Sequence, residues 1–137
     1  MKVHLNLATR DLAGSIAFYR TLLGTPPAKA LADYALFITE DPGLELALDL
    51  DPEAPPGARG QHFGLVVDSA DAVDAQFERL QRGGFPADVQ RDDTCCYALQ
   101  TKVWSRDPDG RRWETYVVHA DTAERDNDPT DCCAAAP

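Results

Sequence analysis

A pattern that occurs twice along the chain restricts its fold more than any other feature of the sequence. Each half begins with a short alternating strand that carries a histidine, His4 in the first half and His62 in the second. A helical pattern follows and ends at glycine, with 20 residues from His4 to Gly24 and 21 from His62 to Gly83. Further strand patterns then flank an Asp-Pro turn. Two copies of one strand–helix–strands unit are therefore expected.

The element boundaries follow from apolar periodicity and from turn residues. In the first half the sequence predicts a helix between 12 and 23 and strands at 3–7, 34–39 and 44–50. In the second half it predicts a helix ending at Gly83-Gly84 and strands at 61–67, 96–101, 102–106 and 112–119. Residues 51–60 are expected to link the halves, and 121–137 to form an acidic, flexible tail. The alternative is an α+β domain whose halves are alike by chance.

The charge balance argues against two classes of partner. The 137-residue chain carries 13 Lys and Arg against 23 Asp and Glu, a formal charge of −10. Nucleic acids and anionic membranes attract a basic face, so neither is an expected partner. No apolar run approaches the roughly 20 residues that cross a bilayer, and the first residues lack the pattern of a signal peptide. A cytoplasmic location is therefore expected.

The four cysteines occur as two adjacent pairs, Cys95-Cys96 and Cys132-Cys133. Neighbouring cysteines bridge each other only through a strained ring, and the cytoplasm keeps thiols reduced, so thiol chemistry is expected rather than a disulfide framework. The alternative for Cys95 and Cys96 is a pair of small buried hydrophobes, although adjacent strand residues point to opposite faces. For the pair in the tail, both soft-metal binding and no dedicated role stay open.

Three residues are candidate metal ligands. His4 and His62 occupy matching strands of the two halves, and Glu114 lies on one face of the last predicted strand. Two imidazoles and one carboxylate leave open positions at a metal, as in non-haem Fe(II) oxygenases. The same donors also suit Zn(II), Mn(II) or Co(II), so the residue types do not choose the metal. Ordinary strand histidines are the competing interpretation.

The repeated unit, with His4, His62 and Glu114 at these spacings, resembles the vicinal oxygen chelate superfamily, which includes glyoxalase I, extradiol dioxygenases and bleomycin- and fosfomycin-resistance proteins. The resemblance covers about residues 1–120. It implies an α+β fold in which two tandem βαβββ modules, about 1–50 and 61–119, form a curved mixed sheet around a metal site within a single domain. Members are often homodimers, some with exchanged modules, so the oligomeric state stays open.

A narrower resemblance concerns four short segments of the second half. They are Asp93–Ala98, Lys102–Trp104, Asp107–Gly110 and Trp113–Tyr116. These segments are similar to those of the organoarsenical carbon–arsenic lyases and of the cadmium-induced proteins. The resemblance implies an Fe(II)- and O2-dependent enzyme that cleaves the C–As bond of trivalent organoarsenicals, such as methylarsenite and aromatic arsenicals. Arsenite would be released, and the role would be arsenic detoxification.

The same resemblance assigns roles to residues. His4, His62 and Glu114 would bind the catalytic Fe(II), with other divalent metals still open. As(III) is a soft centre and thiolates are soft ligands, so Cys95 and Cys96 would hold the arsenical with its As–C bond toward the metal. Lys102 would close over the substrate, although a solvated surface charge is an equal alternative.

Two other functions remain open from the sequence. One is a non-catalytic protein that binds Cd(II) or As(III) through its cysteine pairs. The other is a glyoxalase-like metalloenzyme, which has no need for adjacent cysteines.

Overall fold

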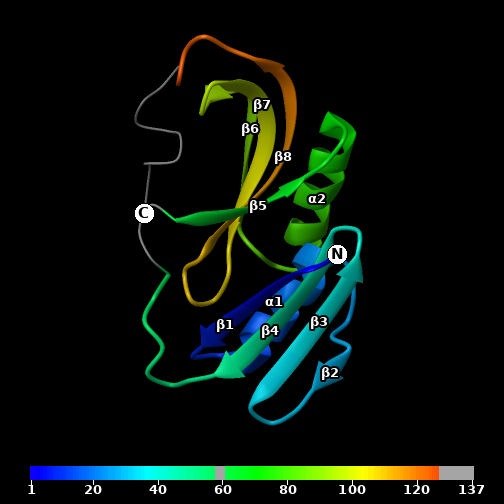
Figure 1. The fold of residues 1–137 in the computed structure, drawn as a ribbon, viewed down its shortest axis with the longest axis vertical. Coiled ribbons are helices and arrows are strands. Elements are labelled where there is room, and N and C mark those ends of the chain that lie inside the picture. The colour runs from blue at the N-terminus through cyan, green and yellow to red at the C-terminus, as the bar shows by residue number, and fades with distance from the viewer. Residues whose placement is uncertain (58–60, 127–137) are drawn as a thin grey trace. The chain divides into compact units, whose positions relative to one another are not determined.

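The computed structural model describes residues 1–57 and 61–126 of the chain. These residues form two compact units (Figure 1). The first unit is Met1–Pro56 together with the short turn Asp107–Gly110, and the second comprises the remaining described residues. Each unit contains one helix and one four-stranded mixed sheet. The repeat that the sequence predicts is therefore confirmed at the level of the modules.

In the first unit, β1 lies at one edge of the sheet and pairs in parallel with β4, while β3 pairs antiparallel with both β4 and β2. The elements are β1 (Val3–Thr9), α1 (Leu12–Leu23), β2 (Lys29–Ala30), β3 (Tyr34–Glu40) and β4 (Gly43–Leu50). The predicted helix and three strands are all present. The two-residue strand β2 is an addition, since two residues carry no periodicity that a sequence could reveal.

Local signals in the sequence set the ends of α1. The Asp11 carboxylate accepts a hydrogen bond of 2.9 Å from the backbone N–H of Gly14, which satisfies one of the free donors of the first turn. At the other end Gly24 adopts a left-handed φ of 66°, the usual helix stop. Between them, Phe18 and Tyr19 are fully buried. Helix α1 thereby covers the apolar face of β3 and β4.

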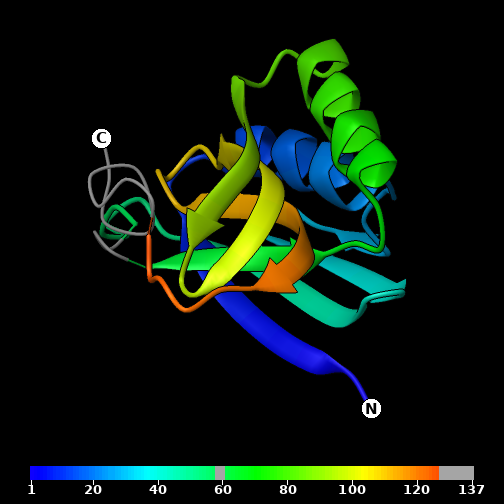
Figure 2. The ribbon, with the colours of Figure 1, turned by 90° about the horizontal axis from the view of Figure 1, so that it is seen from above.

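The second unit repeats this topology, with β5 at one edge, parallel to β8, and β7 antiparallel to both β8 and β6. The elements are β5 (His62–Val66), α2 (Ala70–Arg82), β6 (Ala87–Cys95), β7 (Ala98–Arg106) and β8 (Arg112–Asp121). Figures 1 and 2 show α2 against one face of this curved sheet. Its buried residues Val73 and Leu80 pack there, and Ser69 caps its first turn.

Part of the prediction for the second half is wrong. Residues 96–101 and 102–106 do not form two strands but largely one, β7, and the sequence analysis missed β6 altogether. Polar residues follow one another in Ala87–Cys95 because only part of this strand is buried, so no alternating pattern marks it. The predicted α+β fold of two repeated modules is confirmed, and each module contributes one four-stranded mixed sheet.

Two buried aspartates fix the turn Asp107–Gly110 within the first unit. The Tyr19 hydroxyl donates a hydrogen bond of 2.7 Å to the Asp107 carboxylate, and the backbone N–H of Arg10 donates one of 2.9 Å to Asp109. Both aspartates are less than 5% exposed. Buried carboxylates need such donors, because an uncompensated one is costly to remove from water. The Asp-Pro-Asp-Gly motif is thus a structural anchor as well as a turn.

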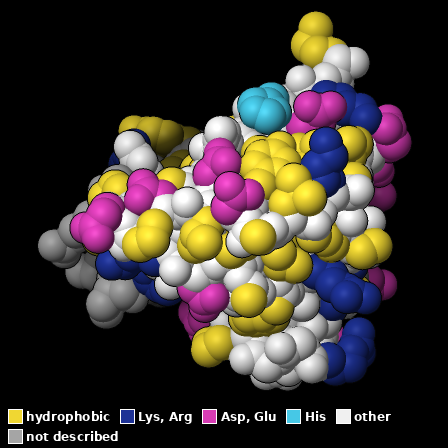
Figure 3. Space-filling model, turned by 90° about the horizontal axis from the view of Figure 1, so that it is seen from below, with side chains coloured by type: hydrophobic (Ala, Val, Ile, Leu, Met, Phe, Trp, Pro, Cys, Tyr) yellow, Lys and Arg dark blue, Asp and Glu magenta, His cyan; other side chains and the backbone are white. Residues whose placement is uncertain are grey.

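On the face that Figure 3 shows, apolar side chains lie between acidic and basic ones, and no extended basic area is visible there. Among the described residues, no helix has both the length and the apolar character to cross a bilayer.

The Tyr19–Asp107 hydrogen bond yields a first prediction. Replacing the tyrosine by phenylalanine, Tyr19→Phe, removes a buried hydrogen bond to a carboxylate, which we expect to lower the free energy of unfolding by about 2 kcal/mol. Urea denaturation followed by circular dichroism measures this. The partly exposed Tyr34 of β3 provides a matched control, and Tyr34→Phe should change the stability by less than about 0.5 kcal/mol. Equal effects of the two substitutions would contradict the anchoring role.

Candidate metal centre and thiol pair

Glu114 and His62 meet on the face of the second sheet that α2 leaves uncovered. Strand β5 runs parallel to β8 in a register that pairs Gly64 with Glu114, so His62 lies one step along the same face. Its Nε2 atom is 3.3 Å from Oε1 of Glu114. Two ligands that each lie about 2.1 Å from one divalent ion are separated by roughly 3 to 3.5 Å. The observed spacing therefore suits a shared metal.

The second carboxylate oxygen of Glu114 is the most informative atom of this cluster. Oε2 is buried and accepts no hydrogen bond among the described residues. Its charge is compensated by Nζ of Lys102, which lies 3.4 Å away on β7 and whose side chain is 1% exposed. A buried carboxylate whose other oxygen, Oε1, lies beside an imidazole is a donor set that a divalent metal fits.

Trp104 forms the wall of the cluster. Its indole meets the His62 ring edge to face, with ring centroids 5.2 Å apart. The guanidinium of Arg112 and the ammonium of Lys102 lie over the same ring, 4.1 Å and 5.6 Å from its centroid, respectively. These contacts hold the imidazole and the two cations in place. Trp104 therefore packs directly against the candidate ligand His62.

Gly64 provides the space in which these groups lie. A Cβ atom at this position would be 2.9 Å from a ring carbon of Tyr116 and 3.5 Å from Oε1 of Glu114. The first distance is shorter than side chains tolerate, so any larger residue would displace the tyrosine or the carboxylate. The absence of a side chain here keeps Oε1 accessible beside His62.

His4 belongs to the other unit. It lies on β1, where its Nδ1 atom is 3.6 Å from Oε2 of Glu45 on β4, and both side chains are substantially exposed. That His4 joins His62 and Glu114 at one metal remains a prediction.

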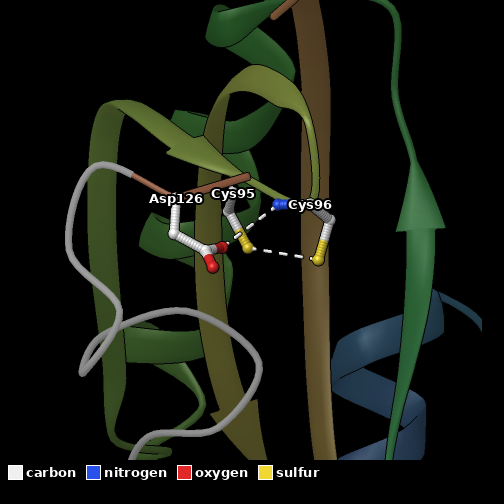
Figure 4. Close-up of side chains that lie close together, drawn as sticks. All are labelled: Cys95, Cys96 and Asp126. Atoms are coloured by element: carbon white, nitrogen blue, oxygen red, sulfur yellow. Dashed lines mark hydrogen bonds between the residues drawn. The ribbon is translucent and has the colours of Figure 1, made fainter. Parts of the chain in front are cut away.

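Cys95 and Cys96 occupy the tight turn between β6 and β7. Cys95 ends one strand and pairs with Ala98, the first residue of the next. Cys96 and Tyr97 between them have φ values of 54° and 64°, the left-handed geometry of a two-residue hairpin turn. Side chains of adjacent strand residues would point apart, but here the two Sγ atoms are 3.5 Å from each other (Figure 4).

The two cysteines differ in exposure and in oxidation state. Cys95 is 1% exposed and disulfide-bonded, whereas Cys96 is exposed and retains its thiol. The bond does not join the neighbours to each other, because Cys96 is not part of a disulfide. Any chemistry that uses both sulfurs together therefore requires Cys95 to be reduced. Cys132 and Cys133 lie outside the described residues.

The chain after β8 returns to this turn. The backbone N–H of Thr122 donates to the carbonyl of Tyr97 at 2.9 Å, and the N–H of Tyr97 donates to the carbonyl of Arg125 at 3.1 Å. The N–H of Cys96 donates to the Asp126 carboxylate at 3.3 Å. The sequence analysis assigned residues from 121 onward to a flexible tail, and no periodic pattern could have revealed these contacts.

Tyr116 interacts electrostatically both with the candidate metal ligand Glu114 and with Cys96 in the turn between β6 and β7. It lies opposite Lys102 in the β7–β8 register. Burial, the Glu114 carboxylate and the Cys96 thiol, in decreasing order, all raise the pKa of Tyr116 above its ordinary value. The phenol is therefore neutral at neutral pH, able to donate a hydrogen bond and unable to add negative charge between the two clusters.

The structure thus brings together three of the predicted site residues, His62, Glu114 and Lys102. It brings Cys95 and Cys96 together as a second group. Lys102 is not a solvated surface charge, and its contact is with Glu114. Sequence periodicity could not indicate this partner, since it depends on the pairing of β7 with β8.

Comparison with known proteins identifies the class. A family model described as the Glyoxalase/Bleomycin resistance protein/Dioxygenase superfamily matches residues 3–115. The chain therefore belongs to this superfamily, and its two repeated modules have the corresponding fold.

Two groups of relatives are similar over almost the whole chain. The trivalent organoarsenical cleaving enzyme of Bacillus sp. (strain MD1) is 39% identical over 135 residues, which are 98% of this chain and 83% of that protein. The enzyme of the same name from Thermomonospora curvata is 39% identical over 134 residues, with 96% and 87% covered. The cadmium-induced protein CadI of Mycobacterium tuberculosis (strain H37Rv) is 38% identical over 142 residues, with 96% and 92% covered.

Solved structures agree with the fold. A glyoxalase/bleomycin resistance protein/dioxygenase from Alicyclobacillus acidocaldarius superposes with a TM-score of 0.70 at 21% identity, covering 88% of this chain and 92% of that one. The fosfomycin resistance protein FosX from Listeria monocytogenes gives a TM-score of 0.66 at 18% identity, with 84% and 90% covered.

The buried ion pair leads to a second prediction. Removing its ammonium in Lys102→Met leaves the Glu114 charge without its partner, which we expect to cost about 3 kcal/mol of stability in metal-free protein. Combining it with Glu114→Gln should cost less than the sum of the two single substitutions, because the double variant buries no unpaired charge. Urea denaturation of all three variants measures the coupling. Additive losses would mean that the two groups do not interact. The exposed Lys29 serves as control through Lys29→Met.

Proposed function

We propose that this protein cleaves the carbon–arsenic bond of trivalent organoarsenicals, such as methylarsenite and aromatic arsenicals, in a reaction that depends on Fe(II) and O2. Arsenite is the inorganic product, and the biological role is arsenic detoxification. The names of two relatives, which are organoarsenical cleaving enzymes, support this assignment. The family alone would not, because members of one fold catalyse unrelated reactions.

The observation that carries the proposal is the 3.5 Å separation of the Cys95 and Cys96 sulfurs. A trivalent arsenical with one organic group has two exchangeable positions, and two thiolates at this spacing can fill both. The remaining As–C bond is then held in one direction, so the two sulfurs both bind and orient the substrate. A glyoxalase-like reaction makes no use of such a pair.

His62 and Glu114 are the residues that would hold the metal in this unit, with His4 as the predicted third ligand. When bound, Fe(II) would supply the binding and activation of O2. Lys102 forms an ion pair with the buried carboxylate and would hold it in place until the metal binds. Because its pKa is raised, the phenol of Tyr116 stays neutral and would not repel a thiolate or an arsenic hydroxyl. Direct contact of Lys102 with the substrate stays a prediction.

The proposed chemistry also sets conditions on the surroundings of the protein. Both sulfurs must be reduced to bind arsenic, so a reducing compartment such as the cytoplasm is the expected location. The substrate is a small molecule, and a homodimer stays a prediction.

A direct assay tests the reaction. Reduced protein loaded with Fe(II) is incubated with methylarsenite in air, and inorganic arsenite is separated and quantified. We expect arsenite to accumulate in air and not under anaerobic conditions. If no arsenite forms while the protein still binds the arsenical tightly, the chain is a binding protein and the proposed reaction is wrong.

Two substitutions separate the roles of the two clusters. Cys96→Ser removes one sulfur and should abolish retention of a trivalent arsenical while Fe(II) affinity stays within about threefold of the wild type. Glu114→Ala should lower Fe(II) affinity at least about tenfold and leave arsenical binding intact. Equilibrium dialysis with arsenic and iron analysis measures both. Glu78→Ala, on the exposed face of α2, is the control. Loss of both properties in both variants would contradict the division of roles.

A further inference from the structure

A third donor lies beside the two sulfurs, and neither the sequence pattern nor the proposed reaction uses it. Ligand atoms of Cys95, Cys96 and Asp126 all lie within 4.8 Å of one another. Figure 4 shows the three side chains converging on one space, the cysteines from the β6–β7 turn and the aspartate from the segment after β8.

The environment of Asp126 favours a cation. Its side chain is only 14% exposed, and Nε of Arg125 lies 3.4 Å from its Oδ2 atom. Cys95 beside it is almost completely buried. If both thiols are ionised, three negative charges share this space with one guanidinium. Burying like charges together is costly, and a divalent cation would remove that cost.

The chemistry of the donors selects the class of ion. Two thiolates and one carboxylate suit a soft or borderline cation with tetrahedral preference, and they do not suit Ca(II) or Mg(II), which prefer oxygen. In a tetrahedral zinc site two sulfurs are about 3.8 Å apart, given Zn–S bonds of about 2.3 Å. The observed 3.5 Å requires only a small adjustment of the side chains.

The backbone holds these donors before any ion arrives. Cys96 and Tyr97 are non-glycine residues at positive φ, a conformation that persists only where the surroundings impose it. Three hydrogen bonds supply that restraint: Tyr97 and Cys96 donate to Arg125 and Asp126, and Thr122 donates back to the carbonyl of Tyr97. A site whose ligands are already ordered loses less conformational entropy on binding.

We propose that reduced Cys95 and Cys96, together with Asp126, form a binding site for a soft divalent cation of the Cd(II) or Zn(II) class. This site is separate from the His62–Glu114 cluster. It shares its sulfurs with the arsenical, so cation and arsenical bind in competition. The two thiols each release a proton when the cation binds, and no oxidation or reduction takes place. The site stands whether or not the chain cleaves C–As bonds.

Cd(II) titration of the reduced, full-length protein tests the proposal. Absorption from thiolate-to-cadmium charge transfer reports only sulfur-bound cadmium, so binding at His62 and Glu114 does not contribute to the signal. Asp126→Asn removes the charge but keeps an oxygen that can accept the hydrogen bond from Cys96. We expect this variant to bind Cd(II) at least tenfold more weakly, with the affinity for phenylarsine oxide unchanged within threefold, because that arsenical needs only the two sulfurs.

Asp121→Asn is the matched control, since it removes an equal charge from the end of β8 and should change the Cd(II) affinity less than threefold. A second test uses Cys132→Ser/Cys133→Ser, in which the same tenfold effect of Asp126→Asn should persist. The proposal is overturned if Asp126→Asn weakens Cd(II) no more than Asp121→Asn does. It is also overturned if the effect of Asp126→Asn disappears when Cys132 and Cys133 are replaced. Failure of the arsenite assay would leave these outcomes unaffected.

Discussion

The second unit is organised around the buried carboxylate of Glu114, one oxygen of which accepts no hydrogen bond from the residues that the structure describes. Burying a carboxylate is costly unless a positive group lies beside it. Lys102 provides that charge from the neighbouring strand at 3.4 Å, and His62 approaches the other oxygen at 3.3 Å. The Trp104 ring and the missing side chain at Gly64 then determine which space remains open beside the carboxylate. A divalent metal fits this arrangement because it satisfies the carboxylate and the imidazole at once.

The turn between β6 and β7, which contains Cys95 and Cys96, departs from the extended conformation of a strand. Two adjacent residues can present their sulfurs to the same ligand only if the backbone leaves the extended conformation. The left-handed Cys96 and Tyr97 accomplish this, and the segment around Arg125 and Asp126 holds them in that conformation by hydrogen bonds. The cysteine pair and the His62–Glu114 pair are thus separate groups within one unit, and Tyr116 interacts electrostatically with both. This separation is what an enzyme needs if it must bind a thiol-seeking substrate without losing its metal to the thiols.

Much of the fold could be predicted from the sequence because its signals are local. The glycine stops and the alternating strands of the first unit act over a few residues, and the structure confirms them. The candidate ligands His62 and Glu114 could also be singled out, because the repeat gives His62 a position that matches His4 and strand alternation places Glu114 on one face of the last strand. Strand β6 was missed because its polar residues hide the alternation. The roles of Lys102 and Asp126 could not be predicted, since they arise from strand pairing and from a contact across 30 residues of sequence, between Cys96 and Asp126.

The most direct test of this account is the position of iron in a crystal of the reduced protein, prepared without oxygen and located by anomalous scattering at the iron edge. The account predicts a peak within bonding distance of both Nε2 of His62 and Oε1 of Glu114, with Lys102 displaced from the carboxylate. A peak at the cysteine turn, with His62 and Glu114 still in contact with each other and with Lys102, would contradict it.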